Sequence, residues 1–445
     1  MKELRVLIAD REAGTLRQGD SGRASFAYDR DWQSSPDALP LSLSMPLPRT
    51  EHPPKVVEPY LWGLLSDNPE TLTQLGRLLG VNPRNAFALL GALGEDLPGA
   101  VQIVPPERVE ELEPRGAITL LSRETLAEKF AELMRNPGAT QFTENGGQFS
   151  LAGAQRKKAL YLVNGKWYEP RGRTPSTYIL KPPISGLAGQ VENEMFCIRL
   201  AAQLGIPAPA CWTETFGDIR VVVVQRYDRV RRDGKRVLNL DQKGGRVDRI
   251  HQEDCCQALG FHPDKKYQRD GGPGVRDIMR LLEGSGNPTA DRETFMRALA
   301  FNFVIGGTDA HGKNYSLLIS KGGRYRLAPL YDIASWLPYS TTGGRDKLAM
   351  SLDGHSRLDE IMPRHWEATA KQSGFDPARM TALIRDLIAR LPDEAAGLAA
   401  VCRSEGMTTG DLGKLAGLFS ARCISLSQLY GSEPLRTKPP RLPGL

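Results

Sequence analysis

Hydrophobic and polar positions alternate differently along the two halves of the chain. Short apolar stretches at 4–10 and 24–32 predict strands near its beginning. Towards the other end, residues 376–391 carry apolar side chains on one stripe at helical spacing, which predicts an amphipathic helix. Strands first and helices later favour an α+β protein over an alternating βαβ sheet.

Capping residues indicate where several helices begin and end. Asn68 before Pro69, and Asn82 before Pro83, each place an asparagine cap ahead of a proline at the first helical position. The first of these helices is expected to end on Gly80. Two further helices are predicted, one over 122–135 and one that begins at Val191 and is closed by Gly205 and Pro207.

The middle of the chain predicts strands and a basic hairpin. Residues 176–181 form a predicted strand that ends in Lys181, and 218–230 is predicted to pair with 235–240 around an Asp-Gly turn. The segment 226–249 holds nine Arg or Lys residues. A solvated hairpin face is the simpler interpretation of this charge, and a surface for nucleic acid or an acidic partner is the alternative.

Length, charge and cysteine usage limit the class of protein. A chain of 445 residues predicts two or three domains, and a net charge of +6 does not by itself indicate a nucleic-acid binder. No stretch approaches the roughly 18 to 20 apolar residues of a membrane span, and the first residues lack the apolar core of a signal peptide. The six cysteines show no paired C-x-x-C spacing, so we interpret them as reduced core thiols rather than zinc ligands. We expect a cytoplasmic protein with no membrane partner.

Polar chemistry is concentrated in the loop between the apolar runs of 301–319. Asp309 and Asn314 lie five residues apart there, and Asp332 follows the apolar stretch 326–331. Phosphoryl transfer from ATP needs a carboxylate to orient the attacking hydroxyl and oxygen ligands for Mg²⁺. Protein-kinase-like enzymes meet both needs with a D-x-x-x-x-N loop followed by a strand-borne Asp. Asp309 would therefore act on the hydroxyl, while Asn314 and Asp332 would bind the metal.

Other residues would complete such a site. Lys181 is placed like the phosphate-binding lysine of a kinase, and Glu194 or Glu192 on the following helix could pair with it. The small-residue loop 150–158 is suited to lie over phosphates. Each feature alone is also explained as an ordinary turn, cap or solvated strand end. Their order along the chain favours a kinase-like site.

Over nearly its whole length the chain resembles the HipA family, the serine/threonine-kinase toxins of bacterial type II toxin–antitoxin systems. "PLSLSMPLP" and "NAFALLGALGEDLPGAVQI" are similar to the N-terminal segment of that family. Six further stretches are similar to parts of the family's kinase core: "SLAGAQRKKAL", "RIHQEDCCQALG", "DGGPGV", "GTDAHGKNYS", "LAPLYDIAS" and "DKLAMSL".

The resemblance implies a two-lobed protein-kinase-like α+β fold with an added N-terminal β-containing subdomain and a mainly helical C-terminal lobe. We accordingly expect an N-terminal subdomain at 1–105, a kinase-like N-lobe at 117–227, a helical C-lobe at 228–431 and a disordered tail at 432–445. By position in the motifs, the implied site consists of catalytic Asp309, metal ligands Asn314 and Asp332, and an autophosphorylated Ser150. The implied ATP contacts are Ala152, Gly153, Ala154, Gln155, Lys157, Lys181, the hinge residues Gln225, Arg226 and Tyr227, and His311 and Lys313 of the catalytic loop.

The resemblance also implies partners. ATP and Mg²⁺ are the expected cofactors, and an aminoacyl-tRNA synthetase, glutamyl-tRNA synthetase in the best-known case, is the expected protein substrate. A small helix-turn-helix antitoxin dimer, HipB-like, would join the toxin to operator DNA. Two alternatives stay open: a weakly active or inactive kinase-fold repressor subunit, and a small-molecule phosphotransferase. Arg156 and Gln225 stand where relatives carry acidic residues, and neither change removes a catalytic group.

Overall fold

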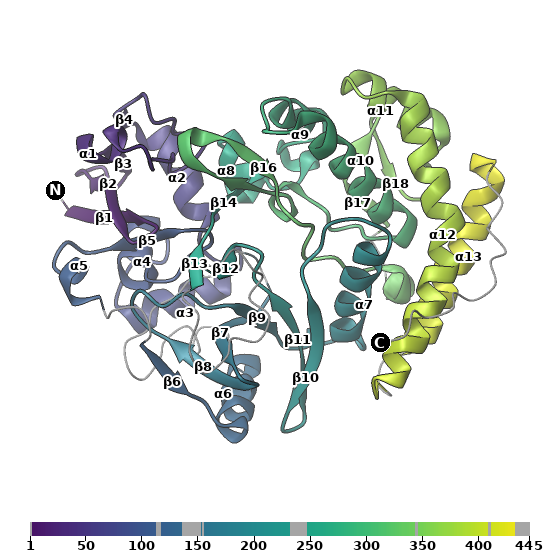
Figure 1. Ribbon diagram of the computed structural model, residues 1–445, viewed down its shortest axis with the longest axis horizontal. Helices are drawn as coiled ribbons and strands as arrows, with labels where there is room; N and C mark the ends of the chain where they lie inside the picture. Colours follow the sequence, from purple (N-terminus) through teal and green to yellow (C-terminus); the bar gives the residue numbers. More distant parts are fainter. Residues whose placement is uncertain are drawn as a thin grey trace. The chain divides into compact units, whose positions relative to one another are not determined.

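The structure is a computed structural model that groups the chain into two compact units (Figure 1). It describes residues 2–112, 117–135, 153, 155–231, 247–342, 346–407 and 411–431. The first unit comprises 1–182, 214–266 and 316–328, and the second comprises 183–213, 267–315 and 329–445. Each unit is therefore assembled from segments that are separated in the sequence.

The first unit begins with an antiparallel sheet of order β4-β3-β2-β1-β5. Alternate residues of these strands, such as Leu4, Val6 and Ile8, face a core that is shared with the helices α2 and α4. The bounds are β1 Lys2–Ile8, β2 Arg11–Gln18, β3 Ala24–Tyr28, α1 Arg30–Ser34, β4 Glu51–His52, α2 Pro54–Gly63, α3 Pro69–Leu79, α4 Ala86–Leu93, β5 Val101–Val104 and α5 Arg108–Glu111.

A second sheet has the order β10-β11-β9-β7-β8-β6. Helix α6 packs on it through Phe130, whose ring lies 5.6 Å from that of Phe216. The bounds are β6 Ile118–Leu120, α6 Arg123–Arg135, β7 Lys158–Val163, β8 Lys166–Pro170, β9 Tyr178–Lys181, β10 Cys211–Phe216 and β11 Ile219–Gln225. Smaller elements of this unit are β12 Arg229–Arg231 paired with β13 Val247–Arg249, the sheet of β14 His251–Asp254, β15 Ser316–Ile319 and β16 Tyr325–Leu327, and α8 Cys255–Leu259.

The second unit is mainly helical. Helix α10 is apolar around most of its circumference and is accordingly buried, with Phe303 packed edge-on against Trp366 of α11 at 5.6 Å. Figure 1 shows α12 and α13 running alongside each other. The bounds are α7 Gln190–Gln203, α9 Val275–Glu283, α10 Pro288–Ile305, β17 Lys347–Leu352, β18 His355–Arg357, α11 Pro363–Gln372, α12 Pro377–Ser404 and α13 Leu412–Tyr430.

The capping predictions have different outcomes. Asn68 does cap α3, since its side chain accepts hydrogen bonds from the amides of Glu70 and Thr71, and Gly80 ends the helix in the left-handed conformation. The predicted start at Asn82 is wrong, because its side chain closes a turn onto the amide of Arg84. Helix α4 begins three residues later, capped by Asn85.

The other predicted helices are present. The helix predicted over 122–135 corresponds to α6, and the one predicted from Val191 to a closure at Gly205 corresponds to α7, which ends at Gln203. Helix α12 extends the predicted stripe from Pro377 to Ser404. The predicted strand 235–240 and its Asp-Gly turn, like the tail at 432–445, lie outside the described residues.

The solvated hairpin face was the wrong interpretation for three of its basic residues. Arg226, Arg229 and Arg249 are 4%, 3% and 6% exposed, and β12 pairs with β13 in register Arg229 to Arg249. Their charges are therefore buried inside the first unit.

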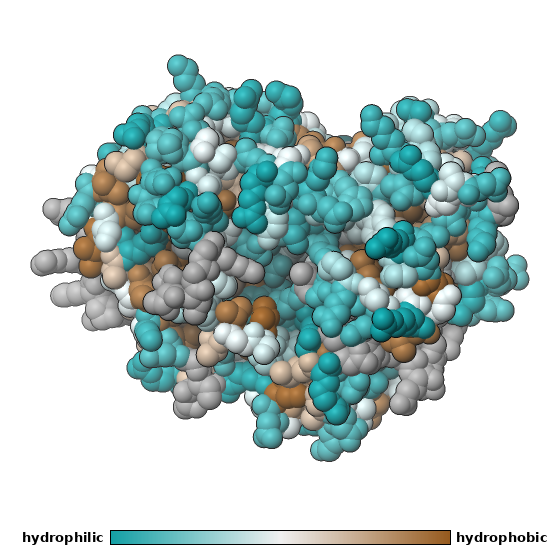
Figure 2. All heavy atoms as spheres, turned by 180° about the vertical axis from the view of Figure 1, so that it is seen from behind, coloured by the Kyte–Doolittle hydropathy of each residue, from teal (hydrophilic) through white to brown (hydrophobic). Residues whose placement is uncertain are grey.

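The surface and the cysteines are those of an ordinary globular chain. Figure 2 shows one face covered mainly by hydrophilic residues, with apolar residues in separate small patches. All six cysteines are buried and outside disulfides. Within the described residues, none of the helices combines the length and apolar character that a membrane crossing requires.

Candidate active site

The loop that carries Asp309 is shaped by glycines at the end of α10. Gly306 ends the helix at φ +68°, and a Cβ there would lie 2.7 Å from Cγ of Leu337. Only glycine combines this backbone conformation with so close an approach. The loop then folds on itself, because the His311 amide bonds to the Asp309 carbonyl at 2.8 Å and the Asn314 amide to the His311 carbonyl at 2.9 Å.

Asp309 is exposed and is held by a tyrosine that the motif did not predict. The hydroxyl of Tyr267 donates to Oδ1 of Asp309 at 2.6 Å, and the Tyr267 ring packs edge-on against the ring of His311 at 4.9 Å. One carboxylate oxygen is thus oriented by the protein. The tyrosine is 42 residues away in sequence, and no local pattern connects the two.

Asp332 is joined to the same loop by a short network. The Tyr331 hydroxyl donates to the Lys313 carbonyl at 2.6 Å. The side-chain nitrogen of Asn314 donates to the backbone carbonyl of Asp332 at 3.4 Å. Ser335 donates to the carbonyl of Ile305 at the end of α10 at 2.6 Å. The structure therefore brings Asn314 and Asp332 together as the motif predicts.

Two features of this pair fit a metal ion. Oδ1 of Asn314 is buried and has no hydrogen-bond partner among the described residues, which is costly for a polar oxygen unless a ligand satisfies it. Asp332 is exposed and adopts φ +57°, a strained conformation for a non-glycine residue that is often found at functional sites. Amide and carboxylate oxygens are the donors that Mg²⁺ prefers, with water and phosphate completing its shell. In the described part of the chain, no group of three or more His, Cys, Asp or Glu residues could hold a metal.

Lys181 and Glu194 are both buried, on different units. Lys181 ends β9 opposite Val222 of β11 and is 6% exposed. Glu194 on α7 is 2% exposed and accepts a hydrogen bond from Gln190 at 3.1 Å. The predicted ion pair between them stays a prediction.

The predicted phosphate loop is described only in part. Gly153 has φ +99°, and its carbonyl accepts bonds from the Ser66 hydroxyl at 3.2 Å and the Asp67 amide at 3.4 Å. The Gln155 side chain donates to the Pro182 carbonyl at 3.4 Å. Lys157 approaches Gly153 so closely that a Cβ there would lie 2.8 Å from its Nζ. Ser150, Ala152 and Ala154 lie outside the described residues.

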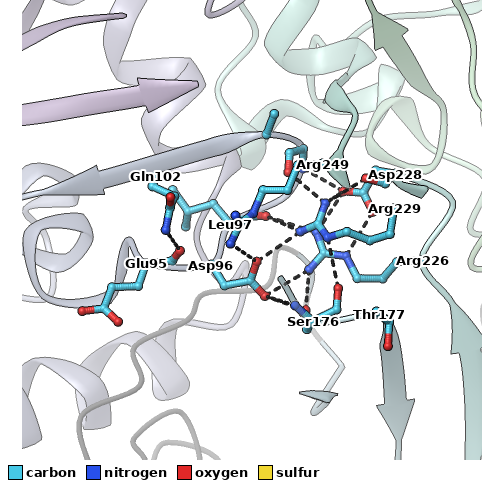
Figure 3. Close-up of polar contacts among 12 residues, drawn as sticks. Glu95, Asp96, Leu97, Gln102, Ser176, Thr177, Arg226, Asp228, Arg229 and Arg249 are labelled. Atoms are coloured by element: carbon cyan, nitrogen blue, oxygen red, sulfur yellow. Dashed lines mark hydrogen bonds and ion pairs between the residues drawn. The ribbon is translucent and has the colours of Figure 1, made fainter. Parts of the chain in front are cut away.

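The hinge residues differ in what their side chains do. Gln225 ends β11 and is 5% exposed, and the Tyr227 hydroxyl donates to Gln252 at 2.6 Å. The Arg226 side chain is engaged with Asp228 and Ser176 at 2.8–3.0 Å (Figure 3). Its backbone amide is bonded to the Thr177 carbonyl, so a nucleotide contact from its backbone would have to use the carbonyl.

Both parts of the chain match models of one family. Residues 149–395, more than half of the chain, match the HipA-like C-terminal domain, and residues 4–104 match the HipA N-terminal domain. The chain belongs to the HipA family. The expected resemblance is confirmed, and so is the expected kinase-like α+β fold class.

Relatives support the assignment. The chain is 32% identical over 371 residues to the serine/threonine-protein kinase toxin HipA of Shewanella oneidensis, covering 79% of this chain and 80% of that protein. It is 35% identical over 402 residues to Y4mE of Sinorhizobium fredii, which is named as a kinase, covering 89% and 90%. A solved complex of Shewanella oneidensis HipA, HipB and operator DNA matches with a TM-score of 0.80 at 27% identity, covering 96% of this chain and 98% of that one. The names of these HipA relatives support a phosphotransferase.

Proposed function

We propose that this HipA-family protein is an ATP- and Mg²⁺-dependent serine/threonine-protein kinase and the toxin of a toxin–antitoxin pair. The observation that carries the proposal is the arrangement around the catalytic loop. The exposed carboxylate of Asp309 is oriented by Tyr267. The same loop carries the buried amide oxygen of Asn314, whose side chain bonds to the backbone of the strained Asp332. A turn with a purely structural role would not need a buried oxygen without a hydrogen-bond partner next to an aspartate with a strained backbone.

Each residue has a role in this proposal. Asn314 and Asp332 would hold Mg²⁺, which supplies charge neutralisation at the phosphates when bound. Asp309 orients the acceptor hydroxyl and takes its proton through the carboxylate oxygen that Tyr267 leaves open. Lys181 would contact the phosphates. The predicted phosphate loop would contact ATP through Ala152, Gly153, Ala154, Gln155 and Lys157. Gln225, Tyr227 and the carbonyl of Arg226 would meet the adenine, while His311 and Lys313 would contact the nucleotide from the catalytic loop.

Membership of the family supports a proposal for the biological setting. We propose that the substrate is an aminoacyl-tRNA synthetase such as glutamyl-tRNA synthetase, whose phosphorylation arrests growth. Phosphorylation of Ser150 would inactivate the kinase, because the added charge would displace the phosphate loop. A HipB-like helix-turn-helix dimer would bind the toxin and carry it to operator DNA. The solved HipA–HipB–DNA complex of the Shewanella relative supports this partner.

Mass spectrometry tests the catalytic proposal. The purified protein is incubated with Mg-ATP, and intact-mass and peptide analysis compares the wild type with Asp309→Ala. We expect one added phosphate on Ser150 in the wild type and a rate about 10²–10⁴-fold lower in the variant, because the group that positions the hydroxyl is gone. Binding of ATP without any phosphate transfer in the wild type would contradict the kinase proposal. That result would favour the repressor-subunit alternative.

A further inference from the structure

A buried cluster of charges joins the N-terminal HipA domain to the proposed nucleotide hinge. Its centre is Asp96, in the loop between α4 and β5 (Figure 3). Oδ1 of Asp96 lies 3.1 Å from Nη2 of Arg229, and Oδ2 accepts from the Ser176 hydroxyl at 2.5 Å. The same hydroxyl accepts a bond from Nη1 of Arg226 at 2.8 Å. Asp96 therefore reaches the hinge arginine through this hydroxyl and also directly, with Oδ2 3.5 Å from Nη1 of Arg226.

The loop around Asp96 also binds the hinge with its backbone. The Leu97 carbonyl accepts from Nη2 of Arg226 at 3.1 Å, and the Gly99 amide donates to Asp228 at 2.8 Å. Gly99 has φ +76°, and a Cβ there would lie 2.7 Å from the backbone nitrogen of Gln252. Gln252 is the residue that holds the Tyr227 hydroxyl. The loop thus contacts Asp228, which pairs with Arg226, and Gln252, which pairs with Tyr227.

These contacts are at the ends of two neighbouring strands. Ser176 lies just before β9, and Arg226 lies just after β11, whose last residue Gln225 is paired with Tyr178. The Arg226 amide also bonds to the Thr177 carbonyl at 2.9 Å. The cluster consequently fixes the ends of β9 and β11, where the adenine is proposed to bind.

The charges balance only when Asp96 is present. Three guanidinium groups, those of Arg226, Arg229 and Arg249, face the carboxylates of Asp96, Asp228 and Asp10. Burial alone would raise the pKa of Asp96, but the three arginines outweigh it and hold that pKa below its usual value. Removing this carboxylate leaves buried cations without their shared partner, and they would have to rearrange.

We propose that Asp96 is a positioning residue for nucleotide binding: through Ser176 and Arg226, the N-terminal domain holds the hinge in the conformation that accepts the adenine of ATP. This inference rests on the proposed function. It makes the N-terminal domain part of the nucleotide site through its contacts with the hinge.

The test compares three variants of the full-length chain. Asp96→Asn removes the central charge, and Ser176→Ala removes only the bridging hydroxyl and remains informative if the first variant does not fold. Glu95→Gln is the matched control. Glu95 is also buried and charged, but it pairs with Arg108, and its side chain points away from the cluster (Figure 3).

Calorimetric titration with Mg-ATP, and with Mg-tripolyphosphate, measures the two halves of the site separately. We expect the Kd for ATP to rise about tenfold or more in Asp96→Asn and several-fold in Ser176→Ala, with Glu95→Gln within about twofold of the wild type. Tripolyphosphate binding should be unchanged in all three, because it makes no adenine contact. The KM for ATP should rise accordingly, with kcat at saturating ATP retained.

The outcomes separate the inference from the function on which it rests. Unchanged ATP affinity in both cluster variants would overturn the inference and leave the kinase proposal intact. Equal weakening of ATP and tripolyphosphate, or an equal effect of Glu95→Gln, would also overturn it, since that is the result of general loosening. A wild type that binds no nucleotide would overturn the proposed function and the inference together.

Discussion

Asp332 has a backbone conformation that favours function over stability. Its φ of +57° costs a non-glycine residue up to roughly 1–2 kcal/mol. We therefore predict that Asp332→Gly has a free energy of unfolding that is higher than that of the wild type or lower by no more than about 1 kcal/mol. Relief of strain opposes the entropy that glycine adds to the unfolded chain. Phosphate transfer should nevertheless fall by about 10²-fold or more, through loss of the proposed metal ligand.

A second strained aspartate provides the control for this prediction. Asp353, in the turn between β17 and β18, has φ +48° and bonds to Gln372 outside the candidate site. Asp353→Gly should keep the transfer rate of the wild type. Urea unfolding and the autophosphorylation rate are measured on both variants. Equal loss of activity in both would mean that the Asp332 phenotype reflects the backbone and not the carboxylate.

Tyr267 leads to a prediction about turnover. Tyr267→Phe removes the 2.6 Å hydrogen bond to Asp309 while keeping the ring against His311. Because one bond to an exposed carboxylate is lost, we expect kcat to fall about 3- to 10-fold with the KM for ATP nearly constant. Tyr339→Phe, which loses a bond to the Ala188 carbonyl in the same unit, is the control. Initial rates at varied ATP concentration separate the two parameters, and a rise in KM alone would contradict the positioning role.

Site residues differ in how far they can be read from sequence. The spacing of Asp309 and Asn314 follows from chemistry that must occur in a fixed order, and the structure places both in one loop. Asp332 was expected at the end of a strand, but it lies in a bend five residues after β16, because the apolar run before it leaves the sheet at Leu327. Tyr267 and Asp96 act across 42 and 130 residues. Contacts of that separation depend on how the segments fold together. Tyr267 belongs to none of the quoted motifs, and the family-like stretch that contains Asp96 gives no sign of its link to Arg226.

At the scale of elements, two identical-looking sequence signals produced one helix start. Asn68 and Asn82 both precede a proline, yet only Asn68 accepts hydrogen bonds from two amides of a following helix. We predict that Asn68→Ala lowers the free energy of unfolding by about 1 kcal/mol and Asn82→Ala by no more than about half of that. Paired denaturant titrations measure the difference. Equal losses would show that the turn at Asn82 is worth as much as a true cap.

Strands and buried helices were predictable from periodicity, and the basic hairpin shows where periodicity fails. Period-2 and period-3.6 patterns report which face of an element is buried, and they identified β1, β9, α7 and α12. Charge was interpreted by a rule that assigns it to the surface. Arg226, Arg229 and Arg249 break that rule, because carboxylates from other segments neutralise them in the interior.

Across the whole molecule, the chain passes repeatedly between its two compact units, so linear boundaries describe it incompletely. The expected division at 105, 117 and 227 stays a prediction. The first unit takes in residues 316–328, whose strand β15 pairs with β14. This pairing places Asp309 and Asn314 only a few residues before a strand of the other unit, and makes folding of the first unit depend on a segment far along the chain.

The stability of the protein should depend on pH through a carboxyl buried in the first unit. Burial raises the pKa of Glu253 from its usual 4.5 to about 8, although the Leu43 amide donates to it at 2.7 Å. The folded protein therefore keeps this proton over a range in which the unfolded chain has released it. Raising the pH from about 4.5 to 8 thus favours unfolding, by at most about 1.4 kcal/mol per pH unit from this group.

Glu253→Gln isolates that contribution, because glutamine is neutral at every pH and resembles the protonated acid in shape. We expect the variant to match the wild type near pH 5 and to exceed it increasingly towards pH 8, as seen in the midpoints of urea unfolding. Glu107→Gln removes an exposed carboxylate of the same unit and should show no such divergence. A constant difference between Glu253→Gln and the wild type from pH 5 to 8 would mean that the pKa of Glu253 is not raised in the folded protein.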